Sequence, residues 1–455
     1  PLYSSAASDV YKRQTENRRL KQKGSVNIMT LTDSDRMSSR SAYFIFVLLF
    51  LLYMFDYIDR LVVVSLFPYI QQDWGVSDAQ LGLLISAVYW SILIFTLPLS
   101  ILVDRWSRVK SIGLMSVIWS LGTIACAFTR NFSQLFMTRS IIGLGEAGYA
   151  PGGSALISAL FPENRRARML GIWNAAIPLG GAIGVALGGY VAQRYGWRHA
   201  FGLVALPGML IGLIFFWVRD YKTVELVKFS GPLGDAPSRT MGLKEIVAEF
   251  AQKPSLIFNN LSMAANVFVT TSLLTWLPTY FYRLEGLDMT QAGLKGSVVM
   301  LMAFIGAPLG GMLADLRYEK RKDSRMLFAS LSSLVTGGLL FIAFAWLRGG
   351  GQYVVLLISG VTAVGFVSAS VAVTQDVVHP GLRAVSLSLN VILQHILGSA
   401  VGPPVIGVLS DAWGLETAML FIPVLNVVAA ILLYVGSRYY AADLAKVGRV
   451  PVEVW

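Results

Sequence analysis

Charge is scarce in this sequence. Only 14% of its 455 residues are charged and 55% are apolar, and the mean hydropathy is +0.62. About 25% charged residues is usual for a soluble globular domain. A water-soluble globule cannot hide so much apolar surface, so lipid must be the solvent for most of the chain. The composition therefore excludes an ordinary soluble protein.

Cysteine and histidine are scarce as well. Cys126 is the single cysteine, so no internal disulfide or cysteine-rich metal cluster can form, and we expect a small buried side chain there. His199, His379 and His395 lie far apart without ligand spacing. We expect no metal ion and no other cofactor. A membrane enzyme is disfavoured too, because no convincing nucleophile and base occur together.

The net charge of +11 does not predict a nucleic-acid partner. The basic residues lie in short clusters between long apolar runs rather than along one polar face. Residues 1–41 hold no apolar stretch of the kind that a cleaved signal needs. The chain begins with Pro1, so the residues before Met29 are left out of the argument as a segment that need not be native.

Twelve apolar runs can cross a bilayer, since about 20 apolar residues span its roughly 30 Å core. The N-terminal half gives 43–69, 80–102, 111–129, 133–159, 169–192 and 199–218. The C-terminal half gives 254–282, 290–314, 325–346, 352–377, 384–410 and 416–437. We predict an all-α integral membrane protein with two six-helix bundles, 43–218 and 254–437. The segments 1–42, 219–253 and 438–455 are predicted to be a tail, a linker and a second tail.

The two halves repeat each other. An offset of 218 residues pairs Pro162 with Pro380, Arg165 with Arg383, Gly180 with Gly398, Gly184 with Gly402, and Gly196 with Gly414. An offset of 211 residues pairs Asp104 with Asp315. A duplicated six-helix unit explains both offsets. Parallel repeats of this kind place a substrate path between the halves near the middle of the bilayer.

Lysine and arginine predict the orientation. With an internal N-terminus, the inner segments hold 29 of these residues, and the outer loops hold Arg130, Arg194, Arg198, Arg283 and Arg348. Because positive charge accumulates on the inside, both termini and the linker are expected to be cytoplasmic. We expect a multi-pass protein of a cell membrane, in particular a bacterial inner membrane, that works as a monomer among membrane lipids.

Five charged residues, three on the first span and two on the fourth, lie in the interior of the predicted spans, whereas Lys295 and Asp376 lie close to span ends. A charge near the bilayer centre costs several kcal/mol and marks a functional candidate. Asp56 and Arg60 are four residues apart and can pair on one helix face. Helical rise places Arg139 at the depth of Asp59, which predicts an ion pair between these two. Glu146 is then left without an evident partner, so it is the main proton-coupling candidate, and a fixed ion network is the alternative.

Two glycine patterns are interpreted as packing. Residues 143–148 fit the G-x-G-x-x-G spacing of a dinucleotide site, but they lie inside an apolar run rather than at a turn between a strand and a helix. The nucleotide interpretation is therefore rejected. Gly180, Gly184 and Gly188 have the small-xxx-small spacing that lets helix backbones approach closely.

The loop from Asp104 to Lys110 resembles the signature G-x-x-x-D-R-x-G-R-x-K of the major facilitator superfamily, and residues 311–315 repeat its first part. Ser100 and Ser107 stand where the signature has glycine. A carboxylate here can accept a charged hydrogen bond from the other half and hold one conformation. The predicted gating residues are Asp104, Arg105, Arg108 and Asp315. A purely topogenic role for these charges is the alternative.

A narrower resemblance rests on both ionisable spans and on the segment 161–201. The matching stretches are Tyr57-Ile58-Asp59-Arg60, Arg139-x6-Glu146-Ala147 with Tyr149, Arg165-Arg166-Ala167-Arg168, Ile177-Pro178-Leu179-Gly180-Gly181 and Gly196-Trp197-Arg198. They resemble the spinster-like branch of the superfamily. The resemblance implies proton-driven alternating access and transport of amphiphiles such as lysophospholipids or sphingoid-base phosphates. A branch that carries organic anions such as hexuronates shares the Asp-Arg and Arg…Glu-Ala patterns, and it is the alternative.

The expected substrate is an anionic amphiphile. Its head would bind Arg60 and Arg139 through charged hydrogen bonds, next to Tyr149. The C-terminal half would contribute Asn266, Thr270, Thr271, Trp276, Asn390, Gln394 and His395. A sugar acid would need dense polar contacts from both halves, and these neutral residues leave that alternative open. A passive channel is disfavoured, because ionisable residues gather on two spans only.

Overall fold

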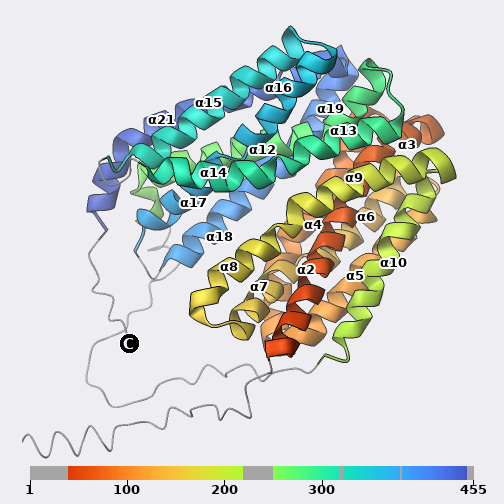
Figure 1. Ribbon diagram of the computed structural model, residues 1–455, viewed down its shortest axis with the longest axis horizontal. Coiled ribbons are helices and arrows are strands. Elements are labelled where there is room, and N and C mark those ends of the chain that lie inside the picture. The colour runs from red at the N-terminus through yellow and green to blue at the C-terminus, as the bar shows by residue number, and fades with distance from the viewer. Residues whose placement is uncertain (1–38, 219–248, 317–320, 380–381, 448–455) are drawn as a thin grey trace, which may run out of the picture. The chain divides into compact units, whose positions relative to one another are not determined.

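The computed structural model describes residues 39–218, 249–316, 321–379 and 382–447, and all regular structure within these ranges is helical (Figure 1). Long apolar runs form helices because lipid offers no hydrogen bonds, so each segment must satisfy its own backbone groups. The chain divides between Phe46 and Val47 into two compact units. The second unit contains both halves of the repeat, apart from the first residues of α2. The predicted domain boundaries stay predictions.

The helices follow the chain in order. The N-terminal half contains α2 (Ser39–Leu61), the 3-10 helix η1 (Val62–Leu66), α3 (Phe67–Trp74), α4 (Asp78–Arg105), α5 (Arg108–Ala127), α6 (Phe132–Glu146), α7 (Tyr149–Leu160), α8 (Glu163–Asn174), α9 (Ala176–Tyr195) and α10 (Trp197–Phe215). The C-terminal half contains α12 (Pro254–Leu284), α13 (Met289–Leu301), α14 (Ala303–Asp315), α15 (Ser324–Ala345), α16 (Gly349–Thr362), α17 (Phe366–Asp376), α18 (Arg383–Gln394), the π-helical turn η3 (His395–Ser399), α19 (Gly402–Trp413), α20 (Leu415–Met419) and α21 (Ile422–Ala445).

Eleven helical segments of the described ranges are long and apolar enough to cross a membrane. They coincide with eleven of the twelve predicted spans. The remaining span, 133–159, is divided into α6 and α7 by a turn at 147–148. Arg139, Glu146 and several glycines make this segment less apolar than the others. The residues that mark it as functional therefore also hide it from a hydropathy criterion.

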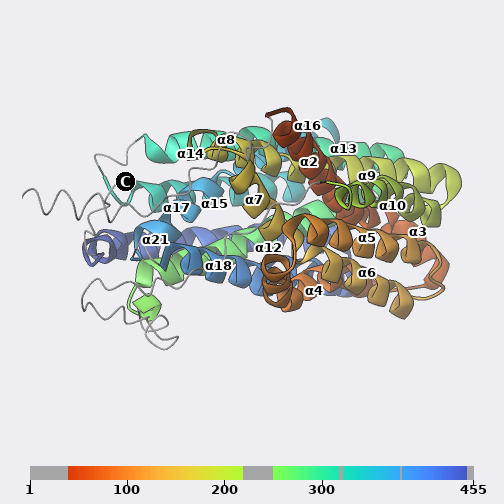
Figure 2. The same cartoon turned by 90° about the horizontal axis from the view of Figure 1, so that it is seen from below.

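Neighbouring helices explain where the functional residues gather. In the N-terminal half, α5 packs against both α10 and α6, as the two views agree (Figures 1 and 2). Helix α6 also packs against α4. The halves meet where α4 contacts α19 and where α9 contacts α13. In the C-terminal half, α21 packs against α12 and α15.

Close backbone approach confirms the glycine spacing on α9. A Cβ at Gly180 would lie 2.3 Å from the carbonyl oxygen of Met54, and a Cβ at Gly184 would lie 2.7 Å from that of Ile58. Gly188 makes the equivalent contact one turn further along. These glycines therefore let α9 pack against the backbone of α2 and η1, as the small-xxx-small pattern predicts.

The same contacts predict a stability difference between two glycines. Gly180→Ala should lower the free energy of unfolding by about 1–3 kcal/mol, because the added methyl group would overlap a backbone oxygen. Gly171→Ala on α8 is the matched control, since a Cβ there meets nothing within 4 Å. Thermal unfolding of the purified variants measures both. Equal melting temperatures would contradict the packing role of Gly180.

The glycines of the rejected nucleotide motif are packing residues too. Gly143 lies inside α6, and a Cβ there would be 2.4 Å from the carbonyl oxygen of Val88 on α4. A Cβ at Gly145 would be 2.6 Å from the backbone nitrogen of Trp119 on α5. The motif therefore joins α6 to its two neighbours.

Candidate functional site

Five ionisable side chains form one buried cluster between α2 and α6. Asp56, Asp59 and Arg60 come from the last turns of α2, and Arg139 and Glu146 come from α6. None is more than 6% exposed. Three residues of α2 share a face because they are three and four positions apart. The two helices therefore bring together the charges that the sequence places on separate spans.

Arg60 is the hub of the cluster. Its Nη2 lies 3.1 Å from Oδ2 of Asp56 and 2.7 Å from Oε2 of Glu146. The predicted pair between Asp56 and Arg60 is confirmed. The expectation that Glu146 lacks a partner is wrong.

Side-chain direction explains this error. Helical side chains lean toward the N-terminus of their own helix. Because α2 and α6 run in opposite directions through the bundle, Arg60 and Glu146 lean toward each other. Counting the rise of the backbone alone overestimates the distance between them.

Arg139 binds backbone rather than a carboxylate. Its guanidinium donates to the carbonyl oxygens of Asp59 at 3.1 Å, Arg60 at 2.8 Å and Leu84 at 3.2 Å. The predicted ion pair between Asp59 and Arg139 is therefore wrong. A change from α-helix to 3-10 helix begins at Val62, shortly after Asp59 and Arg60. Such a change redirects backbone donors from i+4 to i+3, which leaves carbonyl oxygens for Arg139 to bind.

Asp59 is the carboxylate of the cluster that forms no ion pair with a described residue. It is fully buried, and neither carboxylate oxygen accepts a hydrogen bond of normal geometry from a described residue, although Thr123 lies beside it. A buried polar group without a partner is costly, and a buried charge costs more. The cluster holds three acids and two bases, so it has one more carboxyl group than it has guanidinium groups.

Aromatic rings surround the hub and lead to the other half. The guanidinium carbon of Arg60 lies 4.5 Å from the ring centre of Tyr57 and 5.6 Å from that of Tyr89. The Tyr89 ring on α4 stacks on the imidazole of His395 at 5.4 Å. His395 begins the π-helical turn η3, and its Nδ1 lies 2.8 Å from the hydroxyl of Ser399. Tyr89 was not predicted, because an aromatic residue in an apolar span carries no sequence signal of its own.

The predicted polar residues of the C-terminal half mostly bind other residues of the same half. Asn266 is buried and bonds Ser333 and Asn426 at 2.9 and 3.1 Å. Asn390 is buried. Its side-chain oxygen accepts a hydrogen bond from the amide of Gln394, and its own amide nitrogen donates to the side-chain oxygen of Asn260 at 2.8 Å. These amides hold α12 to α15, α18 and α21. Sequence alone shows that they are polar but not which face they occupy.

Three further predicted residues are also bonded inside the protein. The indole of Trp276 donates to the carbonyl oxygen of Pro403 at 3.0 Å. The hydroxyl of Tyr149 donates to the carbonyl oxygen of Leu49 at 2.6 Å. Thr270 is half-buried and donates to the carbonyl of Asn266 on its own helix. Of the predicted substrate-binding residues, Arg60 and His395 lie next to the same aromatic ring.

The gating prediction has a different outcome in each half. The side chains of Asp104 and Arg105 lie outside the described residues, and Arg108 begins α5. Asp315 pairs with Arg325 at 2.9 Å, and Arg325 also pairs with Asp376 at 2.6 Å. All three belong to the C-terminal half. The expected bond from Asp315 to the other half is therefore replaced in this structure by a network within its own half.

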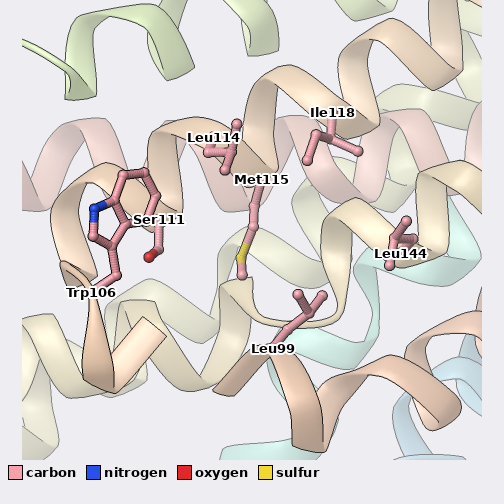
Figure 3. A pocket seen from close by; sticks show the side chains of 7 residues that line it. All are labelled: Leu99, Trp106, Ser111, Leu114, Met115, Ile118 and Leu144. Carbon is pink, nitrogen blue, oxygen red and sulfur yellow. The ribbon is translucent and has the colours of Figure 1, made fainter. Parts of the chain in front are cut away.

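A small pocket lies apart from the cluster. It has a volume of about 130 Å³ between α4, α5 and α6 (Figure 3). Its lining is almost entirely apolar, and it consists of Leu99, Trp106, Ser111, Leu114, Met115, Ile118 and Leu144. No cluster residue lines it, so it offers no charged group for an anion.

Comparison with known proteins agrees with this architecture. The sequence model of the Major Facilitator Superfamily matches residues 49–399. The hexuronate transporter of Bacillus subtilis (strain 168) is 26% identical over 385 residues, which cover 83% of this chain and 90% of that protein. The sphingosine-1-phosphate transporter SPNS2 of Mus musculus is 27% identical over 423 residues, covering 86% and 76%. Protein spinster homolog 1 of Homo sapiens is 28% identical over 394 residues, covering 82% and 73%.

A solved structure shares the fold. It is a bacterial homologue of the human lysosomal transporter Spinster in an inward-facing and unoccupied conformation. The TM-score is 0.79 at 22% sequence identity, and the alignment covers 90% of this chain and 99% of that chain. At this identity the similarity concerns the fold alone. The predicted arrangement of helices in two bundles is confirmed at that level.

Proposed function

The chain belongs to the Major Facilitator Superfamily, and from this premise we propose that it is a proton-coupled secondary transporter of a single-chain anionic amphiphile. One observation carries the proposal. Arg60 is held by two buried carboxylates, Asp56 and Glu146, beside aromatic rings that reach the other half. An anion that is to bind Arg60 has to compete with these carboxylates.

The excess carboxyl group favours binding of a proton by the cluster. With all five side chains ionised, the cluster would carry one uncompensated negative charge, and uptake of a single proton makes it neutral. A neutral buried cluster costs less than a charged one. A proton on Glu146 would weaken its pair with Arg60 and leave that guanidinium for an anionic head group. Proton binding and anion binding would thereby favour each other.

The bonds already made by the predicted polar residues of the C-terminal half favour an amphiphile. A sugar acid needs partners for its hydroxyl groups, and each buried hydroxyl left unpaired costs about 1–3 kcal/mol. Asn266, Asn390 and Trp276 are already bonded within the bundle. An amphiphile needs polar contacts only at its head, and its chain gains about 0.8 kcal/mol for each methylene removed from water.

A proton symporter of small organic anions is the second candidate. The similarity to the hexuronate transporter favours it, and Arg60 suits a carboxylate as well as a phosphate. Uptake into proteoliposomes under an imposed pH gradient tests both candidates with a panel of lysophospholipids and sugar acids. Saturable uptake of lysophospholipid that depends on the gradient is expected. Uptake of glucuronate or galactonate alone would replace the first proposal with the second.

The proposed orientation has its own test. Cysteines introduced as Ser77→Cys and Ser230→Cys, each in a Cys126→Ala background, should react from opposite sides of the membrane. The asymmetry of lysine and arginine predicts that Ser230 is cytoplasmic. In intact cells, an impermeant thiol reagent should therefore label Ser77→Cys and spare Ser230→Cys. The reverse pattern would invert the topology.

A further inference from the structure

The two most extensive contact surfaces between the halves lie at the end of the helices that is remote from the linker, here called the linker-distal end. In the first, called the α4–α19 seam, α4 of the N-terminal half contacts α19 of the C-terminal half. In the second, called the α9–α13 seam, α9 contacts α13. Each seam therefore pairs one helix from each half.

The internal repeat relates the two seams bond by bond. The hydroxyl of Ser86 donates to the carbonyl of Ala400 at 2.5 Å, and the hydroxyl of Ser297 donates to the carbonyl of Ala182 at 2.7 Å. Ser297 is 211 residues after Ser86, and Ala400 is 218 residues after Ala182. These are the two offsets that the sequence repeat shows.

Close backbone contacts obey the same symmetry. A Cβ at Gly407 would lie 2.4 Å from the carbonyl oxygen of Asp78. A Cβ at Gly189, at the matching position, would lie 2.5 Å from the carbonyl oxygen of Met289. Both seams are therefore packed tightly enough that only glycine fits.

A side chain from the opposite half also caps one helix in each seam. The carboxylate of Asp411 accepts hydrogen bonds from the backbone N–H groups of Asp78 and Ala79 at 2.8 and 2.9 Å, where α4 begins. The side-chain oxygen of Gln193, which matches Asp411, accepts from the backbone N–H of Thr290 at 3.2 Å and from its hydroxyl at 2.5 Å, where α13 begins.

Charge breaks the symmetry. Asp78, Ser410 and Asp411 in the first seam match Met289, Ala192 and Gln193 in the second. Arg283 reaches across from α12 and donates to both carboxylate oxygens of Asp78 at 2.7 Å. Gln71 accepts from the same guanidinium at 2.8 Å, and Ser410 donates to Asp78 at 2.6 Å.

We propose that the α4–α19 seam is the lock of the linker-distal end, whereas the α9–α13 seam is a neutral surface that opens once the lock is released. Neutral hydrogen bonds are exchanged for bonds to water with little net change in free energy. The bidentate pair of Arg283 with Asp78 is stronger and more specific in geometry. The proposal concerns the conformational equilibrium and does not depend on which substrate is carried or on proton coupling.

Distances between spin labels on the two halves test the lock. Gln72→Cys on α3 and Gly351→Cys on α16 are exposed linker-distal positions, and a Cys126→Ala background leaves no other thiol. The full-length protein is placed in lipid nanodiscs, and pulsed electron paramagnetic resonance measures the distance distribution. The long-distance population reports an open linker-distal end.

The lock variant is Asp78→Asn combined with Arg283→Gln, which removes the ion pair without leaving a buried unpaired charge. It should raise the ratio of the open to the closed population roughly tenfold. Arg283→Lys keeps the charge but not the bidentate geometry, so an intermediate rise is expected. The matched variant of the neutral seam is Gln193→Ala combined with Thr290→Ala. It should change the ratio by less than about threefold.

Ser86→Ala and Ser297→Ala remove the same hydrogen bond from each seam and serve as folding controls. Their thermal unfolding should be equal. Equal increases of the open population in the lock variant and the neutral-seam variant would overturn the proposal. The proposal would also be overturned if the lock variant had the same distance distribution as the protein with an unmodified seam.

Discussion

Glu146→Gln is expected to abolish accumulation of substrate driven by a pH gradient, down to the level of empty liposomes. Glutamine has the shape of a protonated glutamate but cannot release a proton, so the coupling step is lost. Arg60 would then keep only Asp56 as a carboxylate partner and could still bind an anion. Exchange of labelled for unlabelled substrate without a gradient should therefore remain measurable. The measurement is uptake into proteoliposomes with and without the gradient.

Two variants make this result specific. Glu285→Gln is the matched control, because Glu285 pairs with Lys295 at 2.5 Å outside the cluster, and it should leave accumulation intact. Asp59→Asn tests the carboxylate that has no ion pair. If Glu146→Gln accumulates substrate normally and Asp59→Asn does not, the proton binds Asp59. Normal accumulation in both variants would exclude Glu146 and Asp59 from proton coupling and leave Asp56 as the remaining carboxyl group of the cluster.

The membership of the cluster could be predicted from sequence, but its pairing could not. Ionisable residues inside apolar spans are conspicuous, because lipid makes them costly. The pair of Asp56 and Arg60 follows from spacing on one helix. The pair of Arg60 and Glu146 depends on the directions in which side chains point from two antiparallel helices. The bonds of Arg139 depend on a local change of helix type at Val62, which apolar residues do not reveal.

The helices and the internal repeat could also be predicted from sequence. Span length follows from the thickness of the bilayer, and the repeat is visible in matched glycine, proline and arginine positions. The face that each helix turns toward the protein interior could not be predicted. A helix with lipid on one side and protein on the other can be apolar on both sides. Asn266 and Asn390 were thus recognised as polar residues, while their partners inside the bundle came only from the structure.

Substrate affinity should rise steeply with the length of an acyl chain. Removal of one methylene from water contributes about 0.8 kcal/mol, which is roughly a fourfold change in the dissociation constant. Lysophosphatidates with 10, 12 and 14 carbon atoms, each kept below its micelle concentration, are suitable probes. Displacement of a labelled lysophosphatidate from purified protein measures the series. A sugar-acid site would show no such dependence.

Arg60→Gln separates the head group from the chain. Loss of the charged hydrogen bonds to the guanidinium should weaken binding of every member of the series, by roughly tenfold or more. The dependence on chain length should stay the same, since the apolar contacts are untouched. Arg198→Gln is the matched control, because Arg198 pairs with Asp73 in an exposed position outside the cluster. If glucuronate or galactonate competes at micromolar concentration and chain length has no effect, the amphiphile proposal fails while Arg60 remains the anion site. If Arg60→Gln binds the whole series as tightly as the unmodified protein, the head group binds elsewhere, and the cluster then serves proton coupling alone.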